Sequence, residues 1–486
     1  MSSERPLVRT AAGSVEGVWR GASAAFYGIP YAQAPVGELR FAAPAAALPW
    51  EGVRDASAPG VTPQRRPFGP VTTIPEPCFP GDETLNVNVF TPAPGDADAK
   101  LPVFVWIHGG GYFAGSSSSP WYDGRSFNRD GIVTVSISYR LGFDGFGWIE
   151  DAPTNRGVRD QIAGLQWVHD NIASFGGDPA RVTIAGQSAG GSSVMSLLAS
   201  PLAQPLINGV ICHSGAGLFR TLAEAEQHGR AMAERAGVEP TRAGWSSLSE
   251  DEVLDLQTAY MAPPQSTPPT PAEYVARSLA SPGIPLPFVP LVGDDVLPLG
   301  ITAAIAAGTG ADKALMAGTV AHEFTMGAMG FAEAWADADP VQALVDGGLT
   351  RDNAASYISS HPELTTAAMQ LGQLGTDLSF RLSTIDWADT RTTPVWVYDF
   401  RWITPVLGLS HHCLELPFAW DVLDADAVIP VTGDNPPQPL ADEMHAAWVR
   451  FITTGDPGWA AWTGHNPYVF GGEQTDTYAP SRLLTS

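Results

Sequence analysis

A short run of small residues around one serine constrains the fold of this 486-residue chain more than any other feature. The pentapeptide GQSAG, residues 186–190, follows the apolar run Arg181–Ala185 and precedes Gly191–Leu198, which suits a helix. A G-x-S-x-G sequence between a strand and a helix predicts a sharp, strained turn that exposes the serine hydroxyl. The flanking residues must be small because larger side chains would clash. The sequence therefore predicts that Ser188 is a nucleophile.

Apolar runs that alternate with helical patterns predict the architecture around this turn. The runs are Leu101–Ile107, Ile132–Ser138, Arg181–Ala185, Gly209–Cys212, Ala314–Ala317 and Pro394–Tyr398. Between several of them the apolar residues keep helical spacing, for example over Asp160–Ser174. Strands that alternate with helices form a mostly parallel sheet covered on both faces. We therefore expect an α/β protein with a large, mostly parallel central sheet flanked by helices.

A second glycine-rich segment, HGGG at residues 108–111, directly follows the expected strand Leu101–Ile107. Acyl transfer places negative charge on an oxygen atom, and fixed backbone N–H groups stabilise that charge. Glycines allow the backbone to approach a substrate closely. Three N–H groups are candidates for such an oxyanion hole, those of Gly110, Gly111 and Ala189. We expect His108 to hold the loop and not to take part in catalysis.

A serine nucleophile needs a general base, and the base needs an acid that orients it. On a G-x-S-x-G turn the chain order is serine, acid, histidine. His411 and His412 lie late in the chain, after the last apolar run, and Glu323 follows the run at 314–318. This order favours Ser188, Glu323 and one of the two histidines. Spacing alone leaves three alternatives for the acid, Asp294, Asp295 and Asp399.

Composition excludes several classes of partner. The chain has 51 acidic and 26 basic residues and a net charge of −25, which argues against nucleic acid and anionic membranes as ligands. Three cysteines are too few and too scattered for a disulfide framework or a metal site. The N-terminus has no apolar segment typical of a signal peptide, and no run reaches the ~18 apolar residues of a membrane span. We expect a cytoplasmic protein without membrane insertion, metal or cofactor; its oligomeric state stays open.

Five further motifs occur in the same order in a known family. They are Phe26–Ala32, Gly37–Phe41, Leu85–Phe90, Phe175–Pro179 and Thr453–Pro457. With the two glycine-rich segments, they resemble the type-B carboxylesterases, the cholinesterase-like branch of the α/β-hydrolase superfamily, and most of all its bacterial para-nitrobenzyl-esterase-like members. The resemblance runs from about Gly13 to Pro467. It implies an α/β-hydrolase fold and a cofactor-free serine esterase that acts on small-molecule carboxylic esters.

The resemblance also implies roles for single residues. Ser188 matches the nucleophile, and Glu323 stands where the family's Asp-Glu-Gly motif carries its acid. The segment His412–Phe418 resembles the catalytic-histidine motif, which selects His412 over His411. Gly110, Gly111 and Ala189 match the oxyanion hole. Ser214 is similar to a second serine near the triad, and Arg140 with Asp160 and Arg40 with Asp82 resemble structural ion pairs.

Three departures from the family bear on substrate preference. Thr84 replaces a cysteine that forms a disulfide in secreted members, and no tryptophan lies between Trp50 and Trp106, where cholinesterases bind choline. Gln187 replaces the glutamate that is common before the nucleophile. Both of the last two changes remove groups that attract cations, so we do not expect a choline ester to be preferred. A neutral Gln187 also favours an acid limb at lower pH, because a carboxylate there would stabilise the protonated histidine.

The remaining segments predict insertions in a single domain that spans residues 1–486. Helical patterns at Leu222–Ala236 and Ser249–Tyr260 and proline-dense segments at Pro263–Pro271 and Pro282–Pro290 carry this prediction. We expect insertions at about 219–290 and 325–390, forming cap or regulatory subdomains around an active-site gorge. By resemblance, Ile284 and Leu286 fall where acetyl-specific cholinesterases carry aromatic residues, which predicts tolerance of acyl chains longer than acetyl.

Two alternatives to an esterase follow from the same residues. One is a hydrolase of amides, carbamates or lactones that uses the same serine, because the preferred bond depends on pocket shape. The other is a non-catalytic, cholinesterase-like binding protein, which the joint presence of Ser188, Glu323 and His412 disfavours.

Overall fold

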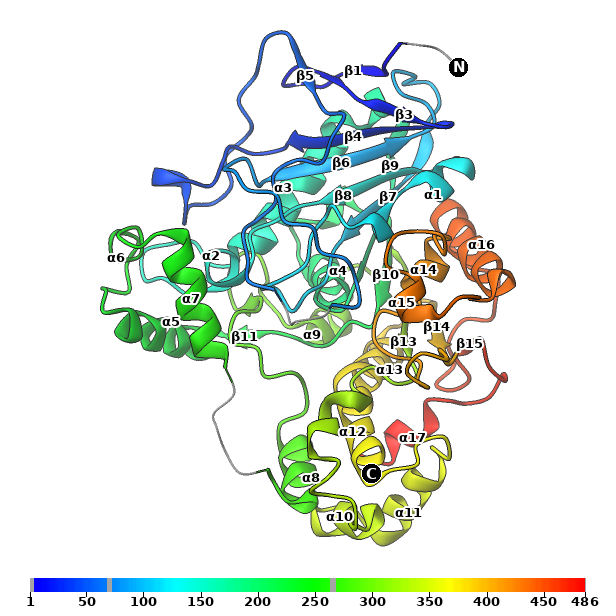
Figure 1. The fold of residues 1–486 in the computed structure, drawn as a ribbon. Coiled ribbons are helices and arrows are strands. Elements are labelled where there is room, and N and C mark those ends of the chain that lie inside the picture. The colour runs from blue at the N-terminus through cyan, green and yellow to red at the C-terminus, as the bar shows by residue number, and fades with distance from the viewer. Residues whose placement is uncertain (1–3, 68–71, 263–267, 486) are drawn as a thin grey trace.

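A ten-stranded sheet forms the centre of the computed structural model, which describes residues 4–67, 72–262 and 268–485 (Figure 1). In spatial order its strands are β15 (Tyr468–Phe470), β14 (Val395–Phe400), β13 (Ala314–Val320), β10 (Gly209–His213), β9 (Gly177–Gln187), β7 (Leu101–Ile107), β8 (Val133–Ile137), β6 (Asn86–Thr91), β4 (Ser23–Pro30) and β3 (Val18–Arg20). Pairing is parallel from β15 to β8 and antiparallel from β8 to β3. The predicted α/β-hydrolase architecture with a mostly parallel sheet is confirmed.

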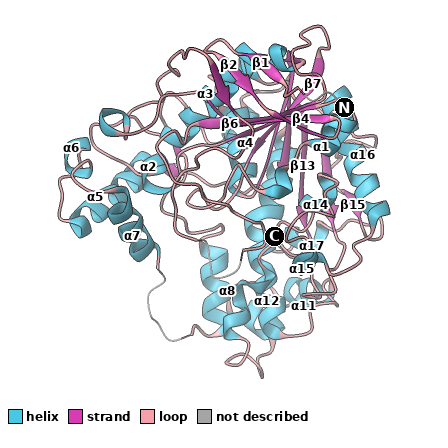
Figure 2. Cartoon of the chain, turned by 45° about the horizontal axis from the view of Figure 1, so that its top comes forward, coloured by secondary structure: helices cyan, strands magenta, loops and turns pink. Residues whose placement is uncertain are grey.

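Strand β7 shows why its sequence is apolar without interruption. Val103, Val105 and Ile107 belong to one hydrophobic cluster, which also contains residues of α3 (Arg156–Asn171) and α4 (Ala189–Ala199). Phe104 and Trp106 point to the opposite face. There they join a second cluster with residues of α1 (Arg125–Arg129), α14 (Leu416–Ala419) and α16 (Gln438–Thr454). Alternate side chains of a strand point to opposite faces, so a strand covered on both sides is apolar throughout. Figure 2 shows the strands fanning across the centre with helices around them.

Two groups of helices lie outside this layered core. The first contains α5 (Leu222–Ala236), α6 (Arg242–Trp245), α7 (Glu250–Met261) and α8 (Pro271–Ala280). The second contains α10 (Pro340–Asp346), α11 (Arg351–Ser359), α12 (Ala367–Thr376) and α13 (Leu382–Thr390). Helices α8, α10, α11 and α12 share a third hydrophobic cluster and gather at the bottom of Figure 1. The predicted helix at Ser249–Tyr260 is confirmed, with Ser249 and Glu252 forming a capping box.

The segment that contains the first group of helices begins and ends at the same place on the core. Strand β11 (Arg220–Thr221) pairs in parallel with β12 (Leu291–Val292), so the ends of the predicted 219–290 insertion lie side by side. Residues 263–267 of the proline-dense segment Pro263–Pro271 lie outside the described residues. Remaining short elements are β1 (Leu7–Arg9), β2 (Ser14–Glu16), β5 (Val53–Asp55), α2 (Gly142–Phe146), α9 (Ile301–Ala306), α15 (Ile429–Thr432) and α17 (Ala479–Arg482).

All three cysteines, Cys78, Cys212 and Cys413, are free thiols. Along the described residues, no helix has both the length and the apolar character needed to cross a bilayer. The cytoplasmic location inferred from the sequence stays a prediction.

Candidate active site

Ser188 lies on the sharp turn between β9 and α4, with φ 61° and ψ −123°. Its N–H donates a hydrogen bond of 2.9 Å to the carbonyl oxygen of His213. A methyl group on Gly186 would lie 2.3 Å from Gly190 O, and one on Gly190 would lie 2.1 Å from Ile107 O. Only glycine fits at either position, because both neighbours are backbone atoms. The pentapeptide thus adopts the strained turn that its sequence predicts.

The HGGG segment packs directly against this turn. A methyl group on Gly109 would lie 3.1 Å from Ser188 Cβ, and Gly110 and Gly111 have φ values of 114° and 61°. Such angles favour glycine. His108 is buried, stacks on Tyr139 with ring centroids 4.6 Å apart, and donates from Nδ1 to Gly109 O. Burial lowers the pKa of His108 to about 4, so it is neutral at pH 7. These contacts suit a residue that holds the loop.

A backbone bridge between His322 and His411 brings the next residue of each segment together. Glu323 Oε2 accepts a short hydrogen bond from His412 Nδ1. The other carboxylate oxygen, Oε1, accepts one from Val320 N at 2.8 Å. The Glu323 side chain is fully buried, whereas that of His412 is 17% exposed. Glu323 therefore holds the imidazole with the proton on Nδ1 and leaves Nε2 as an acceptor.

The three aspartates that spacing left open are occupied elsewhere. Asp294 accepts hydrogen bonds from Thr154 and Asn155. Asp295 pairs with Arg159. Asp399 pairs with the guanidinium of Arg381 in the interior. The structure therefore brings Glu323, and none of these aspartates, to His412.

Gln187 contacts the imidazole of His412 directly, through its side-chain amide. Its Nε2 lies 3.1 Å from His412 Nε2, the nitrogen that Glu323 leaves unprotonated. An amide N–H can donate to that lone pair. Among the described residues, no hydrogen bond joins Ser188 Oγ to His412 in this structure. Apo sites often lack this bond, which forms in the substrate complex.

Two aromatic rings flank the imidazole. The ring of Phe324 lies 5.1 Å from that of His412, and the ring of Phe380 lies 5.2 Å from it. Phe380 belongs to a π-helical turn, Asp377–Arg381, inside the second group of helices. Neither residue is predicted from the sequence as part of the site. Phe324 is next to Glu323, but no local signal marks Phe380, because only the packing of its helix places it here.

Three further residues are predicted at the site, namely Ser214, Leu286 and Ile284. Ser214 is buried and follows His213, whose carbonyl oxygen accepts from Ser188 N–H. It has φ 47°, and its N–H donates to Gly318 O at 2.7 Å. A methyl group on Gly111 would lie 3.6 Å from Leu286 Cδ1, so Leu286 faces the glycine loop. Ile284 is partly buried against the larger hydrophobic cluster. The structure therefore brings Leu286 to the site more directly than Ile284.

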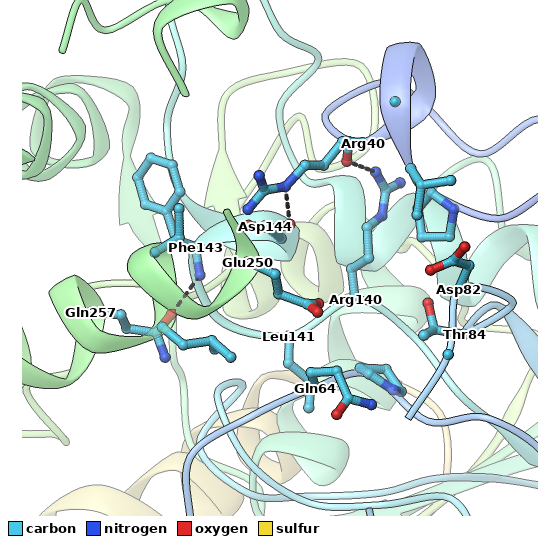
Figure 3. A pocket seen from close by; sticks show the side chains of 17 residues that line it. Arg40, Gln64, Asp82, Thr84, Arg140, Leu141, Phe143, Asp144, Glu250 and Gln257 are labelled. Carbon is cyan, nitrogen blue, oxygen red and sulfur yellow. Dashed lines mark hydrogen bonds and ion pairs between the residues drawn. The ribbon is translucent and has the colours of Figure 1, made fainter. Parts of the chain in front are cut away.

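A separate cavity of about 240 Å³ lies between the N-terminal loops and α7 (Figure 3). Among the described residues that line it, none is Ser188, Glu323 or His412. Arg140 lines it and pairs with the buried Asp160 at 2.7 Å, as predicted. The predicted pair of Arg40 with Asp82 is wrong. Arg40 Nε pairs with Asp144 Oδ2 at 3.1 Å, and Nη1 donates to Leu248 O, which together turn the guanidinium away from Asp82.

The fold and this arrangement define a serine hydrolase of the α/β-hydrolase class. Residues 4–479 match the model of the carboxylesterase family. The chain therefore belongs to the carboxylesterase family and is a carboxylic ester hydrolase.

Relatives span nearly the whole chain. The para-nitrobenzyl esterase of Bacillus subtilis (strain 168) is 32% identical over 474 residues, which is 93% of this chain and 90% of the relative. The phenmedipham hydrolase of Pseudarthrobacter oxydans is 31% identical and covers 93% and 91%. The crystal structure of the Geobacillus stearothermophilus carboxylesterase EST55 at pH 6.2 superposes with a TM-score of 0.83 at 29% identity, covering 99% of this chain and 100% of that one.

Proposed function

We propose that this esterase works through an acyl-enzyme on Ser188, with His412 as general base and acid and Glu323 as the acid that orients it. The hydrogen bond between Glu323 and His412 Nδ1, beside the strained Ser188 turn, carries the proposal. His412 Nε2 takes the hydroxyl proton while Ser188 Oγ attacks the ester carbonyl carbon. His412 then gives this proton to the leaving alcohol. Water then attacks the acyl carbon while His412 takes a proton from it. His412 returns this proton to Ser188 Oγ as the carboxylic acid leaves.

The N–H groups of Gly110, Gly111 and Ala189 stabilise the negative oxygen of each tetrahedral intermediate. Ala189 is the first residue of α4, where helix N–H groups are free to donate. The positive φ angles of Gly110 and Gly111 belong to a loop that packs on the Ser188 turn. Removal of one donor of this kind typically costs about 2.7–4 kcal/mol of transition-state stabilisation.

Reaction with phenylmethylsulfonyl fluoride tests this assignment. We expect esterase activity to fall in proportion to covalent modification, up to one group per chain, and the modified peptide to contain Ser188. An ester substrate should slow the reaction by competing for the same site. Modification of a different residue, or full modification of Ser188 with unchanged activity, would contradict the proposal.

We also propose that the segments 219–290 and 325–390 act as caps over this site. Leu286 of the first segment faces Gly111, and Phe380 of the second lies against His412. Each segment thus contributes a side chain to the surroundings of the proposed triad, although neither contributes a member of it.

Acyl-chain preference provides a prediction from Leu286. We expect butyryl esters of p-nitrophenol to be hydrolysed at least as fast as acetyl esters, because an aliphatic side chain leaves room beside Gly111. Leu286→Phe should lower the butyrate-to-acetate ratio of kcat/KM at least about tenfold, since each methylene group in a pocket is worth about 1–3 kcal/mol. Ile284→Phe should have a smaller effect.

The exposed Leu48 offers a matched control, and Leu48→Phe should leave the ratio unchanged. A wild-type enzyme that strongly prefers acetate would contradict the assignment of this pocket. The octanoyl ester then measures how much longer a chain the site accepts, and phenmedipham belongs in the same panel because a relative is named for its hydrolysis.

The pH dependence of hydrolysis provides a prediction from Gln187. Gln187→Glu should move the acid limb of kcat/KM to higher pH by about one unit, because a carboxylate beside the imidazole stabilises its protonated, inactive form. The variant should also gain affinity for cationic esters. Gln187→Met, which removes the amide and adds no charge, should leave the limb within a few tenths of a unit. An acid limb that is the same in Gln187→Glu and the wild type would rule this explanation out.

A further inference from the structure

Glu415 is an interior carboxyl group that the proposed mechanism does not use. It lies three residues after His412 and precedes α14. Its side chain is fully buried, and neither carboxyl oxygen has a hydrogen-bond partner among the described residues. An ionised carboxylate in such a place loses its hydration without compensation, so the neutral acid is strongly favoured.

The nearest basic group to Glu415 is not a cation. His213 Nδ1 lies 3.6 Å from Glu415 Oε1. The indole N–H of Trp448 donates to His213 Nε2 at 3.0 Å, and the hydroxyl of Tyr398 lies 3.0 Å from Nδ1. An indole N–H can only donate, so Nε2 must carry a lone pair and the imidazole must be neutral. Burial lowers the pKa of His213 to about 3, which agrees with this geometry.

Among the other described groups that interact with Glu415, His412 is the one that becomes positively charged when protonated, and its charge acts against the effect of burial. The groups that interact with Glu415 electrostatically are Tyr122, Tyr398, Cys413, Glu323 and His412. None of the ion pairs formed by the described residues joins Glu415 to an arginine or lysine. His412 already pairs with Glu323. Burial first, and then the charge of Glu323, raise the pKa of Glu415 to about 8.

We propose that Glu415 is a positioning residue that must remain a neutral acid, and that its ionisation ends the alkaline range of the esterase. In the neutral state, Glu323 is the one carboxylate that faces the imidazolium formed during acylation. Loss of the Glu415 proton would place a second negative charge in the same interior. That charge would repel the tetrahedral oxyanion and so raise the energy of the transition state. It would also loosen the packing of the His412 loop against His213. The proposal rests on the proposed function for its effect on rate, but not for the protonation state itself.

The pH profile of kcat/KM, from pH 6 to pH 10, tests the effect on rate. We expect wild-type kcat/KM to fall above about pH 8 with the loss of one proton. Glu415→Gln imitates the neutral acid, so it should stay within about threefold of the wild type at pH 7 and lose the alkaline fall. Glu415→Asp retains an acid and should keep the fall. Glu443→Gln, on α16, removes a carboxylate that accepts from Tyr468 and serves as the matched control, which should keep the wild-type profile.

Thermal unfolding tests the protonation state without any substrate. Between pH 4.5 and pH 8 the folded protein holds the Glu415 proton that the unfolded chain releases, so this group lowers stability as pH rises. Glu415→Gln has no such proton. The Tm of the variant minus that of the wild type should therefore increase from pH 5 to pH 8, whereas for Glu443→Gln this difference should not increase.

The outcomes separate the proposals. A Glu415→Gln enzyme with the wild-type alkaline fall, or a folded one that loses more than tenfold of kcat/KM at pH 7, would overturn the role of the neutral acid. A Tm difference that stays constant would overturn the buried proton. If Glu415→Gln does not fold, Glu415→Asp and the wild type decide. In the wild type, the infrared carbonyl band of protonated carboxyl groups must persist at pH 7 and weaken by pH 9. Absence of this band at pH 7 overturns the proposal. Failure of Ser188 to react with the sulfonyl fluoride would instead contradict the proposed function and leave the unfolding result intact.

Discussion

Ser188→Ala should lower kcat for p-nitrophenyl butyrate at pH 7.5 by about four to six orders of magnitude, because the attacking atom is gone. The oxyanion hole and the binding site remain, so hydrolysis about 10³–10⁴-fold faster than in water should persist. The φ of 61° at position 188 costs alanine about as much as it costs serine. In the described structure Ser188 Oγ makes no hydrogen bond that the substitution would remove. We therefore expect the variant to keep its fold and its Tm.

Ser359→Ala is the matched control for this measurement. Ser359 is exposed on α11, where its hydroxyl bonds only to Ser356 O, and its loss should leave kcat and KM unchanged. Equal rates for the wild type and Ser188→Ala would mean that another group attacks the ester. A folded wild type without activity on any ester of the panel would favour a narrow, different scissile bond.

Glu323→Gln should lower kcat by about 10⁴-fold with little change in KM. The carboxylate accepts the proton of His412 Nδ1 with one oxygen and that of Val320 N with the other. An amide in its place can donate to Nδ1 and so turns the imidazole into the tautomer with the proton on Nε2. That tautomer cannot take the proton of Ser188. The lost charge also stops stabilising the imidazolium in the transition state.

Glu363→Gln separates this effect from the general loss of a carboxylate nearby. Glu363 accepts hydrogen bonds from Arg401 and from His322, the residue that precedes Glu323. Its replacement should cost about 1.5–3 kcal/mol of stability, the usual worth of hydrogen bonds to a charged group, and change kcat by less than about threefold. If the two glutamine variants lose the same fraction of kcat, Glu323 has no special role in orienting His412.

Local sequence was sufficient for the turn that carries Ser188 and for the loop beside it. Gly186 and Gly190 fit where a side chain would meet backbone atoms within 2.3 Å, and such steric limits depend only on neighbours along the chain and on the adjacent strand. The strands were equally predictable, because β7 is apolar on both faces. Short-range sterics and apolar patterning are properties that a sequence contains directly.

Partners of charged groups were predictable only in part: the pair of Arg140 with Asp160 is confirmed, but other pairs depended on the tertiary structure. Four carboxylates suited the spacing of the acid. The family resemblance favoured Glu323, and the bridge between His322 and His411 brings it to His412. Arg40 was predicted to pair with Asp82 and instead pairs with Asp144, because α2 and Leu248 lie on its side. Glu415 lies within the recognisable histidine motif His412–Phe418, but the sequence does not indicate that its side chain is buried without a partner.

By itself the sequence determined the α/β architecture, the strained turn at Ser188 and the glycine loop, since each shows in apolar periodicity or in a short motif of small residues. Only the tertiary structure decided which acid meets His412, that the amide of Gln187 reaches its Nε2, that Phe380 packs beside it and that Glu415 lies without a counter-ion. These contacts join segments far apart in the chain. Their distances and their dielectric surroundings arise from packing, which no short stretch of sequence contains.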